Sequence, residues 1–156
     1  MKGNPRLIEA LNKNLIDEFT AVQQYITHAA IARNWGYKGL ADYLQKRADE
    51  EREHSQQLID RILFLEGKPV VAKLNLVNAA YDIPAQFAND HDAEMTAVAG
   101  YNDAIKIAVE VGDNSTRSLL EEILNDEIAH IDAIENYQTQ INQMTLAIFL
   151  NTQGGA

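Results

Sequence analysis

The chain has 156 residues, of which 46% are hydrophobic and 23% charged, as in ordinary soluble globular proteins. This length suits one domain rather than two, so residues 1–156 are expected to form a single domain. The sequence has no cysteine, which excludes disulfides and thiolate metal sites and leaves nitrogen and oxygen as the only metal ligands. The formal net charge of −10 disfavours nucleic acid as a partner and suits a protein that attracts cations, although solubility alone also explains acidity.

The beginning of the chain carries no recognisable targeting signal. The polar residues 1–5 lead directly into a helical pattern, and no apolar run in the chain is long enough to span a membrane. We therefore expect a cytoplasmic protein that has no membrane partner.

Start and stop signals bound the first two predicted helices. Asn4 followed by Pro5 is typical of an N-cap and the first helical residue, and Gly36 ends that helix. Gly67 and Pro69 end the second helix. Apolar residues recur at helical spacing in both: Leu7, Leu11, Leu15, Val22, Ile26 and Ala29 in the first, and Leu40, Leu44, Leu58, Ile62 and Leu65 in the second.

Two further long helices are predicted in the second half of the chain. A third helix follows Pro84, the residues 112–115 form a turn, and a fourth helix follows that turn. Residues 145–150 are apolar enough for a short fifth helix, which we expect to dock against neighbouring subunits because it cannot bury itself alone. Apolar positions mark the two long helices: Phe87, Val98, Tyr101, Ile105 and Ala108 in the third, and Leu120, Ile123, Ile134, Tyr137 and Ile141 in the fourth.

The connections between these helices predict the architecture. Short turns join the first helix to the second and the third to the fourth, whereas residues 68–82 form a long connection without a helical stripe. Four helices of about 25 to 30 residues are each about 40 Å long, and the middle connection is long enough to run along them. The sequence therefore predicts an all-α, ferritin-like four-helix bundle with one long crossover and a short fifth C-terminal helix.

A carboxylate interrupts the apolar stripe of each long helix. These carboxylates are Glu18, Glu51, Glu94 and Glu127. Burying an unpaired carboxylate costs several kcal/mol or more, so each needs a cation, a proton or strong hydrogen bonds. Two of them begin a Glu-x-x-His pair, whose side chains share one face of a helix; the histidines are His54 and His130.

The spacing of these six residues is itself repeated. Glu18 precedes Glu51 by the same interval as Glu94 precedes Glu127, and one constant shift along the chain converts positions 18, 51 and 54 into 94, 127 and 130. We call this relation the half-chain repeat. One Glu from each of two helices and Glu-x-x-His from each of the other two is the pattern of di-iron carboxylate bundles.

The chemistry of iron explains this set of ligands. Four carboxylates neutralise two divalent ions, and imidazole is a good ligand for iron. We therefore predict that these six residues bind two iron ions per subunit.

With these residues in view, the chain resembles the bacterioferritins over nearly its whole length. The similarity lies in residues 1–3, 24–25, 34–36, 61–67 and 127–132. The resemblance implies that Glu51 and Glu127 bridge the irons, while the terminal ligands are Glu18, Glu94, His54 and His130. It also implies a ferroxidase that oxidises Fe²⁺ with dioxygen or peroxide and deposits ferric mineral inside a homo-oligomeric shell of twenty-four subunits, for iron storage and detoxification.

Three other residues or segments bear on this interpretation. Tyr25 either supplies an electron during oxygen reduction or simply packs in the core. Bacterioferritins bind haem through a methionine that follows the bridging glutamate of the second helix, but Arg52 stands there, and a guanidinium cannot ligate haem iron. The resemblance thus implies no haem, or haem only in a mixed shell with a second subunit type. Within the charged run 49–53, only Glu51 is expected to face inward.

Two alternative functions stay open at this point. A rubrerythrin-like di-iron peroxidase or oxidase shares the bundle, although rubrerythrins add a cysteine-ligated iron site that this chain lacks. A dodecameric mini-ferritin that protects against peroxide usually places its iron site between subunits, whereas all six predicted ligands here lie in one chain.

Overall fold

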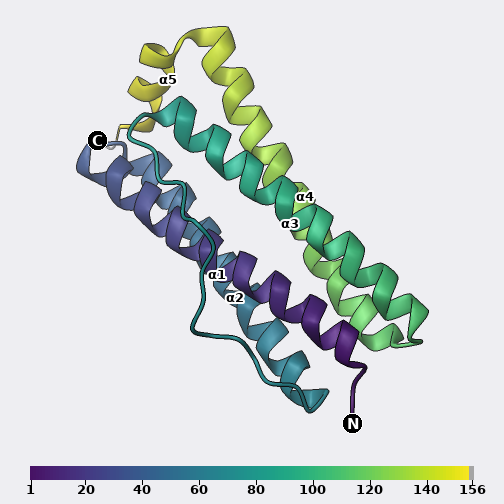
Figure 1. The fold of residues 1–156 in the computed structure, drawn as a ribbon. Helices are drawn as coiled ribbons and strands as arrows, with labels where there is room; N and C mark the ends of the chain where they lie inside the picture. The colour runs from purple at the N-terminus through teal and green to yellow at the C-terminus, as the bar shows by residue number, and fades with distance from the viewer. Residues whose placement is uncertain (155–156) are drawn as a thin grey trace.

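A computed structural model describes residues 1–154 as five α-helices with no strand among them (Figure 1). The helices are α1 (Pro5–Asn34), α2 (Lys38–Phe64), α3 (Ile83–Glu110), α4 (Asn114–Met144) and α5 (Leu146–Gln153). The predicted all-α class is confirmed, as are the four long helices and the short fifth one. None of the helices in this part of the chain combines the length and apolar character needed to cross a membrane.

Local signals in the sequence explain where the helices begin and end. The Asn4 side chain accepts a hydrogen bond from the Arg6 amide, and Asp82 caps α3 in the same way through Ala85. Gly36 has a φ of +85°, a conformation that glycine adopts without steric cost, and it turns the chain from α1 into α2.

The long helices pack as two antiparallel pairs, α1 with α2 and α3 with α4, and α1 also contacts α3 (Figure 1). The segment 65–82 leaves the end of α2 and runs along the bundle beside α1 to the start of α3 (Figure 1). This is the predicted long crossover, and it makes the second and third helices parallel and the first and third antiparallel, so that Arg6 faces Glu110 and His28 faces Asp90.

Side chains of α1 fix the crossover through its main chain. The amides of residues 70, 75, 78 and 80 donate hydrogen bonds to Asn12, Thr20, Gln24 and His28 respectively. His28 is fully buried, and its other ring nitrogen lies 3.0 Å from Asp90 on α3. A segment without secondary structure therefore has main-chain partners along much of its length.

The buried apolar side chains form two separate clusters. The first apolar cluster contains Leu7, Leu11, Leu15, Leu58, Ile62, Leu65, Tyr101, Ala104, Ala108, Leu120 and Ile123. The second apolar cluster contains Tyr25, Ala29, Ala32, Leu40, Ala41, Leu44, Ala48, Ile83, Phe87, Ile134 and Phe149. A buried polar layer separates the two clusters, because along the long helices its residues lie between members of the first cluster and members of the second. The layer consists of residues 18, 51, 54, 94, 127 and 130.

The C-terminal segment was expected to need a neighbouring subunit in order to bury its apolar residues, but helix α5 buries one of them, Phe149, within its own chain. It folds back onto its own bundle, where Phe149 is fully buried beside the rings of Phe87 and Tyr137. It also continues to Gln153, past the predicted end at position 150. The opposite side of the helix is open, with Ile148 56% exposed.

The N-cap of α4 generates a stability prediction. Asp113 accepts hydrogen bonds from the Thr116 amide and hydroxyl and from Arg61 at 2.7 Å. Burial alone would raise the pKa of Asp113, but these bonds outweigh it and hold the pKa below its ordinary value. The resulting stability is present above the unfolded-state pKa and is lost as the pH falls through the lower folded-state pKa.

We therefore expect Asp113→Asn to lower the free energy of unfolding by about 1 to 2 kcal/mol at pH 7, and this difference from wild type to disappear in acid. Urea unfolding at a series of pH values measures it. Asp82→Asn, at an N-cap that is exposed and has no arginine partner, is the matched control and should change little. A deficit in Asp113→Asn that persists unchanged in acid would contradict the assigned role of the charge.

Candidate metal centre

The buried polar layer contains all six residues that the sequence singles out as metal ligands. Glu18 comes from α1, Glu51 and His54 from α2, Glu94 from α3, and Glu127 and His130 from α4. Each of the six is at most 4% exposed. The helical spacing that brings apolar residues to the core brings these side chains there too, because they occupy the same stripe.

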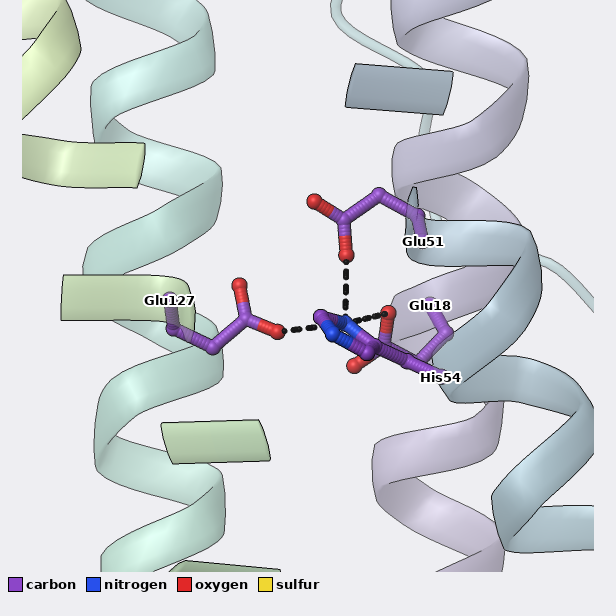
Figure 2. A group of neighbouring side chains, drawn as sticks. All are labelled: Glu18, Glu51, His54 and Glu127. Carbon is purple, nitrogen blue, oxygen red and sulfur yellow. Dashed lines mark hydrogen bonds and ion pairs between the residues drawn. The ribbon is translucent and has the colours of Figure 1, made fainter. Parts of the chain in front are cut away.

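The six side chains form two overlapping groups of four. Glu18, Glu51, His54 and Glu127 each offer a ligand atom within 4.8 Å of the others (Figure 2), and so do Glu51, Glu94, Glu127 and His130. Glu51 and Glu127 belong to both groups, one from α2 and the other from α4. This arrangement can hold two cations side by side, with the two shared carboxylates between them and one glutamate and one histidine at each end.

The two histidines direct equivalent ring nitrogens into the site. His54 Nδ1 lies 3.0 Å from Glu127 Oε1, 3.1 Å from Glu51 Oε2 and 3.6 Å from Glu18 Oε2 (Figure 2). His130 Nδ1 lies 3.0 Å from Glu51 Oε1, 3.4 Å from Glu94 Oε1 and 3.5 Å from Glu127 Oε2. Each nitrogen therefore faces three carboxylates from three different helices.

Several of these atoms are close without being properly hydrogen-bonded. Both oxygens of Glu127, one each of Glu18 and Glu51, and His130 Nδ1 are buried and have no hydrogen-bond partner among residues 1–154. Buried polar atoms without partners are rare in folded proteins because each costs about 1 to 3 kcal/mol. Oxygen and imidazole donors that converge in this way fit a divalent transition-metal ion.

The charges of the cluster respond strongly to burial and to each other. Burial, together with neighbouring carboxylates, raises the pKa of Glu18 and of Glu94 well above the ordinary value. For Glu127, burial alone would raise the pKa, but the imidazoles of His130 and His54 beside it hold it well below the ordinary value. Burial would likewise lower the pKa of both histidines, yet the carboxylates around them prevail, raising that of His130 to about 12 and that of His54 strongly.

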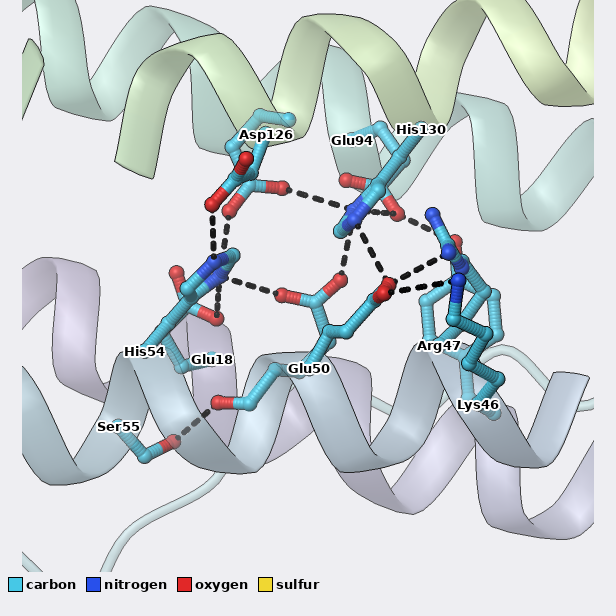
Figure 3. A network of polar contacts seen from close by, with 12 residues as sticks. Glu18, Lys46, Arg47, Glu50, His54, Ser55, Glu94, Asp126 and His130 are labelled. Carbon is cyan, nitrogen blue, oxygen red and sulfur yellow. Dashed lines mark hydrogen bonds and ion pairs between the residues drawn. The ribbon is translucent and has the colours of Figure 1, made fainter. Parts of the chain in front are cut away.

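A second layer of carboxylates holds the outward-facing nitrogens of the histidines. Asp126 lies 3.4 Å from His54 Nε2, and Glu50 lies 3.2 Å from His130 Nε2 (Figure 3). Arg47 contacts Glu50 at 2.6 Å, and Lys46 lies 3.5 Å from it. Within the run 49–53 only Glu51 is buried, as expected, but the partly exposed Glu50 also reaches the site from its outer side.

Two tyrosines hold the terminal glutamates. The Tyr25 hydroxyl donates a hydrogen bond to Glu94, and the Tyr101 hydroxyl donates one to Glu18. Both rings are almost completely buried, and burial followed by the neighbouring carboxylates raises the pKa of each phenol well above its ordinary value. Both tyrosines are therefore protonated donors to the cluster.

Sequence reasoning missed Tyr101, Glu50 and Asp126 as parts of the site, although the signal was present. The half-chain repeat that relates the ligands also relates Tyr25 to Tyr101, and Glu50 to Asp126. Each of these four residues contacts a ligand from the other half of the chain. Applying the repeat to neighbours of the ligands, and not only to the ligands, would have identified them.

A cavity of about 180 Å³ connects the cluster with the side of the bundle where the crossover runs. Its wall includes the glutamates Glu18, Glu51, Glu94 and Glu127, together with polar residues closer to the surface, namely Asp17, Asn75, Asn78, Asn89 and Asp92. A lining of carboxylates and amides suits a small cation better than an apolar ligand.

Arg52 lies apart from this cluster. Its side chain is 72% exposed and lies 3.7 Å from Asp49, one turn away on the same face of α2. Its guanidinium offers five N–H donors and no lone pair for a metal. At this position the chain provides no haem ligand.

Comparison with known proteins agrees with the fold. The ferritin family, described as a ferritin-like domain, matches residues 8–144. A bacterioferritin of Brucella melitensis is 36% identical over 135 residues, which cover 86% of this chain and 84% of the relative. A bacterioferritin of Streptomyces coelicolor is 32% identical over 152 residues, covering 97% and 91%. The chain therefore belongs to the ferritin superfamily and, within it, to the bacterioferritins.

Proposed function

We propose that this protein stores and detoxifies iron, as a ferroxidase that oxidises Fe²⁺ to Fe³⁺ with O₂ or H₂O₂ and deposits ferric mineral inside a homo-oligomeric shell. The observation that carries the proposal is the pair of overlapping ligand groups, which share Glu51 and Glu127. Two ferrous ions held side by side can each give one electron to the same oxidant. Membership of the bacterioferritins supports the storage function independently of the site.

In this proposal the carboxylates bind both oxidation states of the substrate iron. Glu51 and Glu127 bridge the two ions, Glu18 with His54 completes one position, and Glu94 with His130 completes the other. Four carboxylates neutralise two ferrous ions, and their hard oxygens bind Fe³⁺ still more strongly, so the ligand set favours oxidation.

The outer carboxylates would position the histidines for this role. A histidine that binds metal through one ring nitrogen commonly donates the other N–H to a carboxylate, which fixes the ring and raises its basicity. Asp126 forms a long hydrogen bond of 3.4 Å with His54 Nε2, and Glu50 makes an ion-pair contact of 3.2 Å with His130 Nε2. Both rings are thereby oriented with Nδ1 toward the ligand cluster.

We propose that the shell has about twenty-four subunits. It contains either this chain alone or a second bacterioferritin subunit as well, and in either case Arg52 binds no haem. The net charge of −10 per chain supports cation uptake by such an assembly. A rubrerythrin-like enzyme is less well supported because the chain has no cysteine. A dodecameric mini-ferritin is less well supported because all the candidate ligands come from one chain.

Size-exclusion chromatography with light scattering, followed by addition of Fe²⁺ in air to the metal-free protein, tests the proposal. We expect a large closed assembly that takes up many irons per chain and stays soluble. A small oligomer that oxidises about two irons per chain and then stops would instead establish a di-iron redox enzyme.

The first mutational prediction concerns the shared carboxylate. Glu127→Gln should slow initial iron oxidation by at least about 100-fold, since even partners outside the metal's own ligands contribute 10- to 100-fold. Stopped-flow absorbance of the ferric product measures the rate. Glu122→Gln, on the exposed side of the same helix, is the control and should oxidise iron normally. Normal oxidation by Glu127→Gln in an intact assembly would overturn the ligand assignment.

A second prediction follows from the protonation of the cluster. The raised pKa values of His54 and His130 keep both imidazoles protonated at pH 7, and burial together with the neighbouring carboxylates favours the protonated forms of Glu18 and Glu94. Two divalent ions should therefore release at least the two imidazolium protons per chain on binding, and the affinity should rise with pH. Calorimetry with Co²⁺ in buffers of different ionisation enthalpy counts these protons. Binding without proton release would contradict the predicted charge state.

A further inference from the structure

Tyr101 is the one fully buried tyrosine on α3, and its hydroxyl is directed out of an apolar cluster toward Glu18. The ring belongs to the first apolar cluster, together with Leu11 and Leu15. The hydroxyl donates its hydrogen bond to Glu18 Oε1, whereas Glu18 Oε2 is the atom that faces His54 Nδ1. One glutamate thus connects the phenol to the proposed iron position through its two oxygens.

The same arrangement occurs on the other side of the site. Tyr25, the counterpart of Tyr101 in the half-chain repeat, belongs to the second apolar cluster and donates its hydrogen bond to Glu94. Each tyrosine therefore contacts the terminal glutamate of the opposite half of the chain. A merely space-filling tyrosine needs no such pairing, and the two rings lie in separate apolar clusters where water does not reach them.

We infer that Tyr101 is a second one-electron donor in oxygen reduction, acting together with Tyr25 so that one di-iron site reduces one O₂ completely to water. This inference rests on the proposed ferroxidase function. Reduction of O₂ to two water molecules takes four electrons and four protons, but two ferrous ions supply only two electrons. The two phenols supply one electron each, and their protons pass to the neighbouring glutamates. Solvent supplies the four protons that the two water molecules need.

The hydrogen bonds define where the phenol protons go. As Tyr101 loses an electron, its O–H bond breaks and the proton moves to Glu18 Oε1, leaving a neutral tyrosyl radical. Tyr25 transfers its proton to Glu94 in the same way. The products are two Fe³⁺, two tyrosyl radicals and two water molecules, and the surrounding apolar side chains protect both radicals from solvent.

The choice of oxidant supplies an internal control. H₂O₂ needs only two electrons to become two water molecules, and two ferrous ions provide both. The inference therefore requires tyrosyl radicals when O₂ is the oxidant and none when H₂O₂ is the oxidant. A tyrosine that only positions Glu18 would show no such dependence.

The test compares wild type, Tyr101→Phe, Tyr25→Phe and the double variant, each given two Fe²⁺ per chain and then O₂. Freeze-quench EPR counts the radicals, and a peroxidase assay measures released H₂O₂. Tyr43→Phe is the matched control because the Tyr43 hydroxyl has no hydrogen-bond partner in the described part of the chain. Co²⁺ titration shows whether each variant still binds two ions per chain.

We expect Tyr101→Phe, Tyr25→Phe and the double variant all to lose the radical signal and release about one H₂O₂ per iron pair, because two ferrous ions and a single tyrosine cannot supply four electrons. Tyr43→Phe should match wild type. If Tyr101→Phe keeps the full signal, or changes only Co²⁺ affinity, Tyr101 is not an electron donor. Failure of wild type to oxidise iron at all would instead refute the proposed function. Iron oxidation without radicals in wild type would refute only this inference.

Discussion

The rest of this structure depends on one constraint: four carboxylates lie in the middle of a helical bundle, in a layer with an apolar cluster on either side. Like charges in a buried layer repel each other and lose hydration, which is costly unless protons or cations compensate. In the absence of metal, the imidazolium charges of His54 and His130 offset part of the carboxylate charge, and the raised pKa values of Glu18 and Glu94 favour their neutral forms. Two divalent ions can compensate all four carboxylates when these protons leave. The layer thus exchanges protons for metal, so that its net charge changes less than the charge of the metal alone would require.

The half-chain repeat gives this layer its internal symmetry. The two halves do not each build half a site from their own residues. Instead, Tyr101 holds the Glu18 of the other half, and Asp126 and Glu50 each hold the histidine of the other half. The symmetry is broken outside the ligands, since Glu50 is tied to Arg47 while Asp126 is 66% exposed. The two ends of the site therefore differ in their surroundings although their ligands are the same.

Much of the fold follows from the sequence because its signals are local or periodic. The N-cap at Asn4, the turn at Gly36 and the apolar stripes predict the four helices, and the length of residues 68–82 predicts the crossover. The six candidate ligands stand out because a carboxylate at a core position is chemically exceptional. The position of α5 could not be predicted, because a short apolar helix packs equally well on its own bundle or on a neighbour. Glu50 was missed as part of the site because its long side chain bends from the helix surface to His130, which helical spacing does not describe.

The four hydrogen bonds between the crossover and α1 determine which substitutions the crossover can accept. Asn12, Thr20, Gln24 and His28 lie along one line of α1, because their positions differ by multiples of four, and all four accept hydrogen bonds from main-chain amides. Side chains of the crossover take no part in these four bonds, and Leu74, Leu76 and Tyr81 are exposed. Substitutions at these exposed positions of the crossover should therefore leave its attachment to α1 intact, provided that no proline replaces a residue whose amide donates one of the four bonds. The four side chains on α1, in contrast, must keep their acceptor atoms.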